Sequence, residues 1–238
     1  PSSSLIALRI IVIEDLNSYL EHISTMRKAI KDEEGQVADL QKFFFRGQAN
    51  CNWDVVPGIF RENYLSYESE LINGAYLRNP SEFRQLNTDF EKLAKLQHYG
   101  LPTRLLDVTS NPLVALYFAC QPYQEFNEVD NSIIKPDGAV LFSRAYSKGC
   151  NDLEVSVISH LANMEINGDT TLKTLLEELE DKRIYSIKSA KDCREGQYKS
   201  LIEILQNNYF VVSNMNNERL VRQSGLFLLI GKYNIIFN

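Results

Sequence analysis

Three polar stretches interrupt apolar sequence and contain the side chains best suited to binding an anion. They are "FRGQ" at 45–48, "QHYGLPTRLLDVTSNP" at 97–112 and "NERLVRQSGLF" at 217–227. A guanidinium gives planar, paired hydrogen bonds to phosphate or ribose oxygens, which lysine cannot reproduce. These stretches are therefore the candidates for a binding or catalytic site.

Arg46 follows directly after three phenylalanines, the most apolar tripeptide in its region. An unpaired buried guanidinium costs several kcal/mol, so something has to meet this charge. Another part of the chain could supply a carboxylate, such as that of Asp107, or a ligand could supply an anion. The residues by themselves leave both alternatives open.

The periodicity of the first two stretches predicts short strands. In the first, alternation separates Phe43, Phe45 and Gly47 from Phe44, Arg46 and Gln48, which predicts burial on both faces. In the second, it separates Thr103, Leu105 and Asp107 from Arg104, Leu106 and Val108. Arg104 and Asp107 are therefore not expected to pair with each other.

Helices flank the second strand. Thr88 and Glu91 form a capping box, and Gly100 is placed to end that helix. Asn111 is a predicted N-cap, with Pro112 at the first helical position. The pattern also predicts helices at 15–30, 66–79, 170–183 and 189–207, and strands at 5–13, 137–143, 209–213 and 225–237. With no internal repeat or linker, the sequence predicts one α+β domain over residues 1–238.

Net charge, residue spacing and the absence of common motifs argue against several functional classes. The net charge of −6 argues against a broadly basic nucleic-acid surface and leaves room for a local basic cleft. The longest early apolar run, 5–13, is too short to cross a bilayer, which predicts a cytoplasmic protein with no membrane partner. The spacing of the cysteines and histidines predicts neither a metal site nor a disulfide framework. No P-loop, dinucleotide-binding glycine motif or nucleophile elbow is present.

Some residues have two interpretations. His98 could meet the last carbonyls of its helix or contact a ligand through Tyr99. Trp53 could be a platform on which a ligand stacks, or it could pack against other residues of the chain. Arg104, Arg219 and Arg222 could line a phosphate-facing cleft or be solvated. The aromatic residues of "ALYFA" at 115–119 are expected in the core.

The combination of these stretches resembles the FRG family, named for its Phe-Arg-Gly tripeptide. It comprises "FFRGQ", then Trp, Pro and Arg within 53–61, "LQHYGLPTRLLDVTSNPLVALYFA" and "NERLVRQSGLF", and covers most of 40–230. The main departure is Val108, where the family usually has Trp. FRG proteins in turn resemble the ADP-ribosyltransferase superfamily and often look like effectors of bacterial toxin or antiphage systems.

This second resemblance implies a split β core flanked by helices and a site for NAD between the Arg46 strand and the turn at 109–111. By motif, Arg46 and Gly47 correspond to the first conserved position, Thr109 and Ser110 to the second, and Gln223 to the third, where the superfamily usually has Glu. The implied NAD-binding residues are Arg46, Gly47, Gln48, His98, Tyr99, Thr109, Ser110 and Asn111. The implied catalytic residues are Arg46, Asp107 and Gln223.

The resemblance thus implies transfer of ADP-ribose from NAD to a macromolecule, a nucleic acid or a protein, by the toxic component of a bacterial defence system. An antitoxin or other partner protein fits such a system. Two alternatives stay open, because glutamine cannot supply the usual carboxylate: a NAD glycohydrolase, and a non-catalytic module that binds nucleotides or nucleic acid. Asp107 on the neighbouring strand could supply the missing charge.

Overall fold

The computed structural model describes residues 11–34, 42–127, 131–166, 170–185, 196–212 and 225–231. The chain divides into two compact units, Pro1–Gln41 and Lys42–Asn238. In the first unit, α1 (Leu16–Glu34) confirms the helix predicted at 15–30. The strand predicted at 5–13 has no regular structure at 11–13 and otherwise lies outside the described residues. The single domain stays a prediction.

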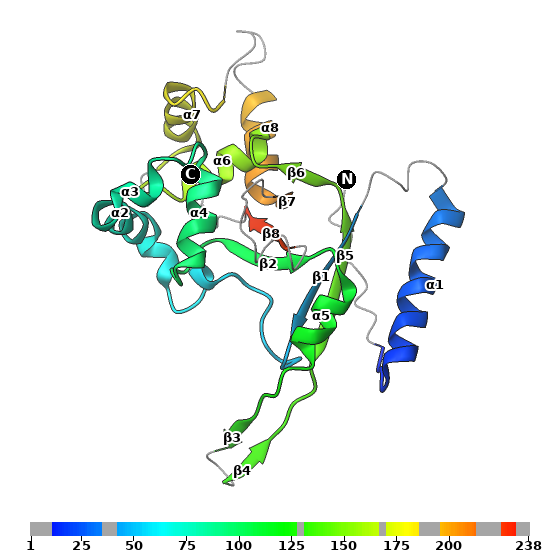
Figure 1. The fold of residues 1–238 in the computed structure, drawn as a ribbon. Helices are drawn as coiled ribbons and strands as arrows, with labels where there is room; N and C mark the ends of the chain where they lie inside the picture. The colour runs from blue at the N-terminus through cyan, green and yellow to red at the C-terminus, as the bar shows by residue number, and fades with distance from the viewer. Residues whose placement is uncertain are drawn as a thin grey trace. The chain divides into compact units, whose positions relative to one another are not determined.

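The second unit is built on a six-stranded sheet (Figure 1). In spatial order its strands are β5 (Ala139–Ala145), β1 (Lys42–Gln48), β2 (Leu105–Thr109), β8 (Gly225–Ile230), β7 (Asn208–Val212) and β6 (Ser147–Gly149). Only β6 and β7 are parallel among these neighbours. Strands and helices occur in one unit, so the predicted α+β class is confirmed.

Helices cover one face of this sheet. They are α2 (Glu68–Arg78), α3 (Pro80–Phe83), α4 (Asp89–His98), α5 (Pro112–Ala119), α6 (Leu153–Leu161), α7 (Leu172–Asp181) and α8 (Gly196–Gln206), with short 3-10 turns η2 (Gly58–Phe60) and η3 (Tyr64–Tyr67). The main core lies between the helices and the sheet, where Phe90 of α4 meets Phe227 of β8 edge to face. The Thr88–Glu91 capping box and the left-handed Gly100 are confirmed.

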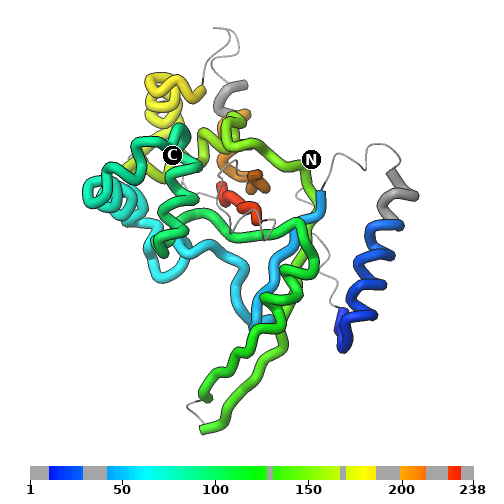
Figure 2. The backbone as a smooth tube through the Cα atoms, in the orientation of Figure 1, coloured from blue at the N-terminus to red at the C-terminus, as the bar shows by residue number. Residues whose placement is uncertain are grey.

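A two-stranded hairpin, β3 (Glu125–Asn127) and β4 (Ser132–Ile134), was not predicted from sequence. Figures 1 and 2 show it extending away from the sheet. Phe126 and Ile133 face each other across it and are both exposed. Each strand has three residues, too few for a periodic signal in the sequence.

The triplet of phenylalanines is buried from two sides, as its alternation predicts. Phe44 packs in a small cluster with Val108 and Leu226, and its ring stacks on that of Phe210. Phe45 is fully buried on the other face, the one that α5 covers.

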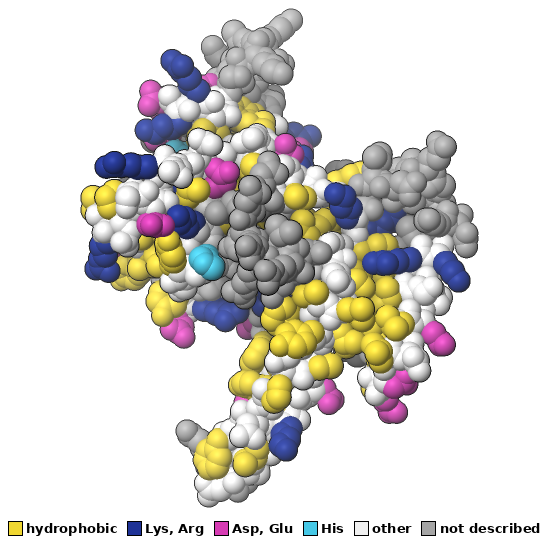
Figure 3. Space-filling model, viewed as in Figure 1, with side chains coloured by type: hydrophobic (Ala, Val, Ile, Leu, Met, Phe, Trp, Pro, Cys, Tyr) yellow, Lys and Arg dark blue, Asp and Glu magenta, His cyan; other side chains and the backbone are white. Residues whose placement is uncertain are grey.

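The predicted burial of the α5 aromatics is wrong. Tyr117 is 62% exposed and Phe118 is 36% exposed, whereas Ala115 and Ala119 are buried. The alanines face the sheet because α5 lies too close to β1 for larger side chains. Figure 3 shows hydrophobic side chains gathered over α5.

The proposed phosphate contact of Arg104 is also wrong, and so is its solvated alternative. Arg104 is completely buried and paired with Glu68, the first residue of α2, which is 4% exposed. Its Nε donates to Glu68 Oε1 at 2.9 Å, and Nη2 donates to Oε2. This pair ties α2 to the residue before β2 and confirms that Arg104 does not pair with Asp107.

Removing one partner of this pair should destabilise the protein strongly. We expect Arg104→Met to lower the free energy of unfolding by about 3–5 kcal/mol, because it removes the cation that neutralises the buried Glu68 carboxylate. The double variant Glu68→Leu, Arg104→Met should lose less, since no charge stays buried. Urea unfolding measures both. Arg84→Met, at an exposed arginine, is the control. A single variant no worse than this control would contradict the prediction.

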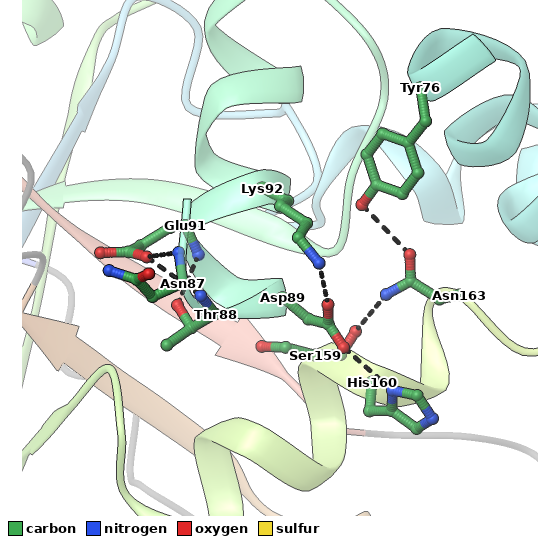
Figure 4. Close-up of polar contacts among 9 residues, drawn as sticks. All are labelled: Tyr76, Asn87, Thr88, Asp89, Glu91, Lys92, Ser159, His160 and Asn163. Atoms are coloured by element: carbon green, nitrogen blue, oxygen red, sulfur yellow. Dashed lines mark hydrogen bonds and ion pairs between the residues drawn. The ribbon is translucent and has the colours of Figure 1, made fainter. Parts of the chain in front are cut away.

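A second polar network joins α4 to α6 (Figure 4). His160 Nδ1 lies 2.9 Å from Asp89 Oδ2, and Lys92 Nζ lies 2.8 Å from Asp89 Oδ1. Burial alone would raise the pKa of Asp89, but the hydrogen bonds and positive charges of His160 and Lys92 outweigh it and hold the pKa below its usual value. The Asp89 carboxylate therefore stabilises the fold in its ionised form.

Because the pKa of Asp89 is lower in the folded than in the unfolded chain, its contribution is present above about pH 4 and is lost as the pH falls through the folded pKa. We expect Asp89→Asn to cost about 1.5–3 kcal/mol of unfolding free energy at neutral pH. The difference from the wild type should shrink in acid. Glu70→Gln, at an exposed carboxylate, is the control. Urea unfolding across pH tests this, and a constant difference would count against it.

Candidate functional site

The sheet is weakest where β1 meets β2. These two strands are in register at one pair, Phe45↔Thr109, whereas β1 and β5 pair over seven residues from Lys42 to Gln48. Since Phe45 stands opposite Thr109, alternation places Arg46 on the opposite face from Asp107 and Thr109. Arg46, Asp107 and Thr109 thus meet at one junction but do not all share a face.

Arg46 lies in this junction and binds the neighbouring strand. Its Nη1 donates to the backbone carbonyl oxygen of Asp107 at 2.7 Å. Its Nε is buried and has no hydrogen-bond partner among the described residues. Within the same part of the chain, no carboxylate forms an ion pair with Arg46. The internal salt bridge with Asp107 that the sequence allowed is therefore not formed there.

The charges around Arg46 compensate the positive charge of its guanidinium only in part. Burial lowers the pKa of its guanidinium; the negative charge of Asp107 opposes this effect, and the positive charge of Arg61 adds to it. Arg61 follows η2 and donates from Nη2 to the Val56 carbonyl oxygen at 3.0 Å. Arg61 therefore adds positive charge to the surroundings of Arg46, which favours binding of an anion there.

Gln48 holds the loop that follows β1. Its Nε2 donates to the carbonyl oxygens of Asn50 at 3.2 Å and Trp53 at 3.0 Å, and the side chain is buried. Asn50 is buried too, and its Nδ2 donates to Glu125 Oε1 at 2.7 Å. The glutamine of the "FRGQ" motif is thus engaged in positioning the loop.

Gly47 has a packing role that the sequence did not reveal. A Cβ on this residue would overlap the carbonyl oxygen of Ala115 in α5. The glycine is required because the helix backbone crosses the strand in direct contact. This accounts for Gly47 without any ligand.

The turn between β2 and α5 is held by its own side chains. Thr109 Oγ1 accepts from the Asn111 backbone N–H at 3.0 Å, and Asn111 Oδ1 accepts from Leu113 N–H at 2.9 Å. The predicted N-cap at Asn111 is confirmed. Ser110 is exposed between them. Of these predicted NAD ligands, Ser110 has the side chain that these hydrogen bonds leave available.

His98 and Tyr99 are both exposed and lie at the end of α4. This helix end precedes β2 in the chain, whereas the turn that contains Ser110 follows β2. The Tyr99 hydroxyl donates to Glu82 Oε2 at 2.7 Å, which ties it to α3. The chain therefore reaches the two groups of predicted ligands at opposite ends of β2.

Of the predicted catalytic residues, Arg46 and Asp107 are adjacent through the Asp107 backbone. The Asp107 side chain is exposed between buried neighbours, and its carboxylate has no hydrogen bond within the described residues. Gln223, with Arg219 and Arg222, lies outside those residues.

The described ranges contain no group of three or more side chains suited to hold a metal ion, and none of their helices is long and apolar enough to span a membrane.

Sequence reasoning missed Arg61, Asn50 and Glu125 as parts of the site. Arg61 was present in the motif, but its proximity to Arg46 depends on how the loop folds back. Asn50 and Glu125 are 75 positions apart, and no local pattern signals their hydrogen bond.

The FRG domain family model matches residues 41–128, which contain the whole junction of β1, β2 and α5. No curated protein and no solved structure matches the chain. The third stretch, at 217–227, lies beyond the matched segment. The resemblance to the FRG family is therefore supported over residues 41–128.

Proposed function

We propose that this protein binds NAD at the junction of β1 and β2 and transfers ADP-ribose to a macromolecule, as the effector of a bacterial defence system. The observation that supports this most is the state of Arg46: half-buried, with one unpartnered nitrogen and no ion pair among the described residues. A dinucleotide pyrophosphate supplies the missing negative charge, and Arg61 adds a second cation.

The residues at the junction suit a reaction that needs little proton transfer. In ADP-ribosyl transfer, the bond between the ribose C1′ and nicotinamide breaks, and the pyridinium leaves as neutral nicotinamide. The ribose then carries cationic character, and a nucleophile of the acceptor attacks C1′ and releases a proton. A carboxylate beside the ribose would stabilise that cation and compensate for glutamine at position 223; Asp107 is the candidate on the neighbouring strand, and it would have to act from the face of the sheet opposite Arg46.

A specific observation favours a second candidate, a nucleotide-binding module without catalysis. The side chains of Gln48, Thr109 and Asn111 are engaged in local hydrogen bonds. Asp107 projects to the opposite face from Arg46 by the strand register. Such an arrangement can hold an anion and still lack a carboxylate beside the ribose. Hydrolysis of NAD to free ADP-ribose is the third candidate function.

Incubation with NAD labelled in its ADP-ribose part and with cell lysate separates these functions. We expect label on a macromolecule, and loss of that label with Arg46→Ala. Arg84→Ala, which removes an exposed arginine, should transfer label like the wild type. Free ADP-ribose with nicotinamide would mean a glycohydrolase. Binding without consumption of NAD would leave only the binding module.

The stability of Arg46→Ala in the absence of ligand tests the role of the arginine. The variant loses one hydrogen bond to a carbonyl and removes a buried charge, so we expect a change of about 1 kcal/mol or less. The rise in melting temperature that NAD produces in the wild type should disappear. Differential scanning fluorimetry with and without NAD measures both. A loss of about 3–5 kcal/mol would instead show that Arg46 is structural.

A further inference from the structure

His160 of α6 is a buried histidine that the proposed NAD site does not use. Its Nδ1 lies 2.9 Å from Asp89 Oδ2 of α4 (Figure 4), and its Nε2 lies 3.8 Å from Glu178 Oε1 of α7. Nε2 is buried and has no hydrogen-bond partner among the described residues. Buried polar atoms are normally hydrogen-bonded, so this ring nitrogen needs an explanation.

The Asp89 carboxylate fixes which nitrogen of the neutral ring carries the proton. The pKa of Asp89 is held below its usual value, so this carboxylate is ionised and can only accept hydrogen bonds. Its partner Nδ1 must therefore donate. In the neutral ring, Nε2 is then a bare acceptor, and it faces the Glu178 carboxylate, which is an acceptor too.

A proton on Nε2 reverses the character of this contact. The charged ring donates from both nitrogens, so Nε2 becomes a cationic donor that faces a carboxylate. Histidine is the side chain that ordinarily changes its charge between about pH 5 and 8. The attraction between His160 and Glu178 is therefore present in weakly acidic solution and is lost as the pH rises.

Charged and titratable groups on the neighbouring helices do not occupy Nε2. On α4, Lys92 Nζ lies 2.8 Å from Asp89 Oδ1, so it supports the ionised carboxylate. On α2, the Tyr76 hydroxyl donates to Asn163 Oδ1 at 3.1 Å. Burial, and then the charge of Asp89, raises the pKa of this hydroxyl, which stays neutral. Glu178 is thus the charged side chain that Nε2 faces among the described residues.

This contact is also the polar attachment of α7. Among the described residues, the pair of His160 and Glu178 is the one side-chain ion pair or hydrogen bond that joins α7 to another element. Lys182, at the end of α7, lies 3.7 Å from the same Glu178 oxygen, but it is exposed, so water screens that pair. The other attachment of α7 is apolar and consists of leucines buried in the main core: Leu175, Leu176 and Leu179.

We propose that His160 is a proton-dependent clamp, which holds α7 against α6 and α4 when its ring is charged and loosens α7 when its ring is neutral. In weakly alkaline solution, α7 therefore detaches more often and its buried leucines reach water. The clamp does not rest on the proposed function, because none of its residues belongs to the junction of β1 and β2.

Hydrogen exchange followed by mass spectrometry measures how often α7 opens. After correction for the intrinsic effect of pH on exchange, the protection of the α7 peptide should fall by about 2- to 10-fold between about pH 5.5 and pH 8. The peptide of α5 is the internal control and should change little. Constant protection of α7, or an equal loss in α5, would overturn the clamp.

The variant Glu178→Gln separates the clamp from simple packing. Its side-chain amide can donate to the neutral Nε2, so α7 should keep its protection at about pH 8 and lose its pH dependence. Glu177→Gln is the matched control, because it removes a neighbouring exposed carboxylate of the same helix, and it should behave like the wild type. The Glu178 side chain is 39% exposed, so its replacement should leave the fold intact, which melting curves check. A wild-type pH dependence in Glu178→Gln would contradict the proposal.

The position of the proton on the neutral ring gives an independent test. Nitrogen-15 NMR at about pH 8 should show the proton of His160 on Nδ1. The chain has three histidines, so comparison with His160→Gln assigns the signals. A proton on Nε2 would mean that the neutral ring already donates toward Glu178, and the clamp would then have no switch.

Discussion

The close contact of α5 with the backbone of β1 is the constraint on which the rest of this region depends. A side chain at Gly47 would overlap the Ala115 carbonyl oxygen, and one at Gly138 would overlap that of Ala119. Two glycines and two alanines therefore let the helix lie directly on the strands. With this face of β1 occupied by α5, Arg46 and Gln48 must point to the other face, where Gln48 anchors the loop that carries Trp53. The same contact turns Tyr117 and Phe118 toward solvent.

Two arginines show how differently the fold treats the same charge. Arg104 is paired with Glu68 in the interior, so its charge is satisfied and its role is to fix α2 against β2. Arg46 meets only a carbonyl oxygen among the described residues and keeps a buried nitrogen without a partner. A carbonyl carries a partial charge and cannot neutralise a guanidinium. This difference makes Arg46 the better candidate for binding an anion.

Much of the fold near the site was predictable because its signals are local. Thr88 with Glu91, Gly100, and Asn111 with Pro112 each lie within a few residues of the helix end that they define. The alternation of the phenylalanines also predicted burial of Phe44 and Phe45 on two faces. The short hairpin strands gave no periodic signal, and the orientation of α5 could not be read from a helix that is apolar nearly all round.

The sequence by itself determined the types of the site residues, the caps of the flanking helices and the resemblance to the FRG family. Only the tertiary structure decided that Glu68 neutralises Arg104, that Arg61 lies near Arg46, and that Glu125 holds Asn50. The tertiary structure also gave Gly47 a packing role against α5. The physical reason is that caps and alternation depend on neighbours within a few residues, whereas ion pairs and steric contacts join residues far apart in the chain. Their formation depends on the path of the whole backbone, which no local pattern contains.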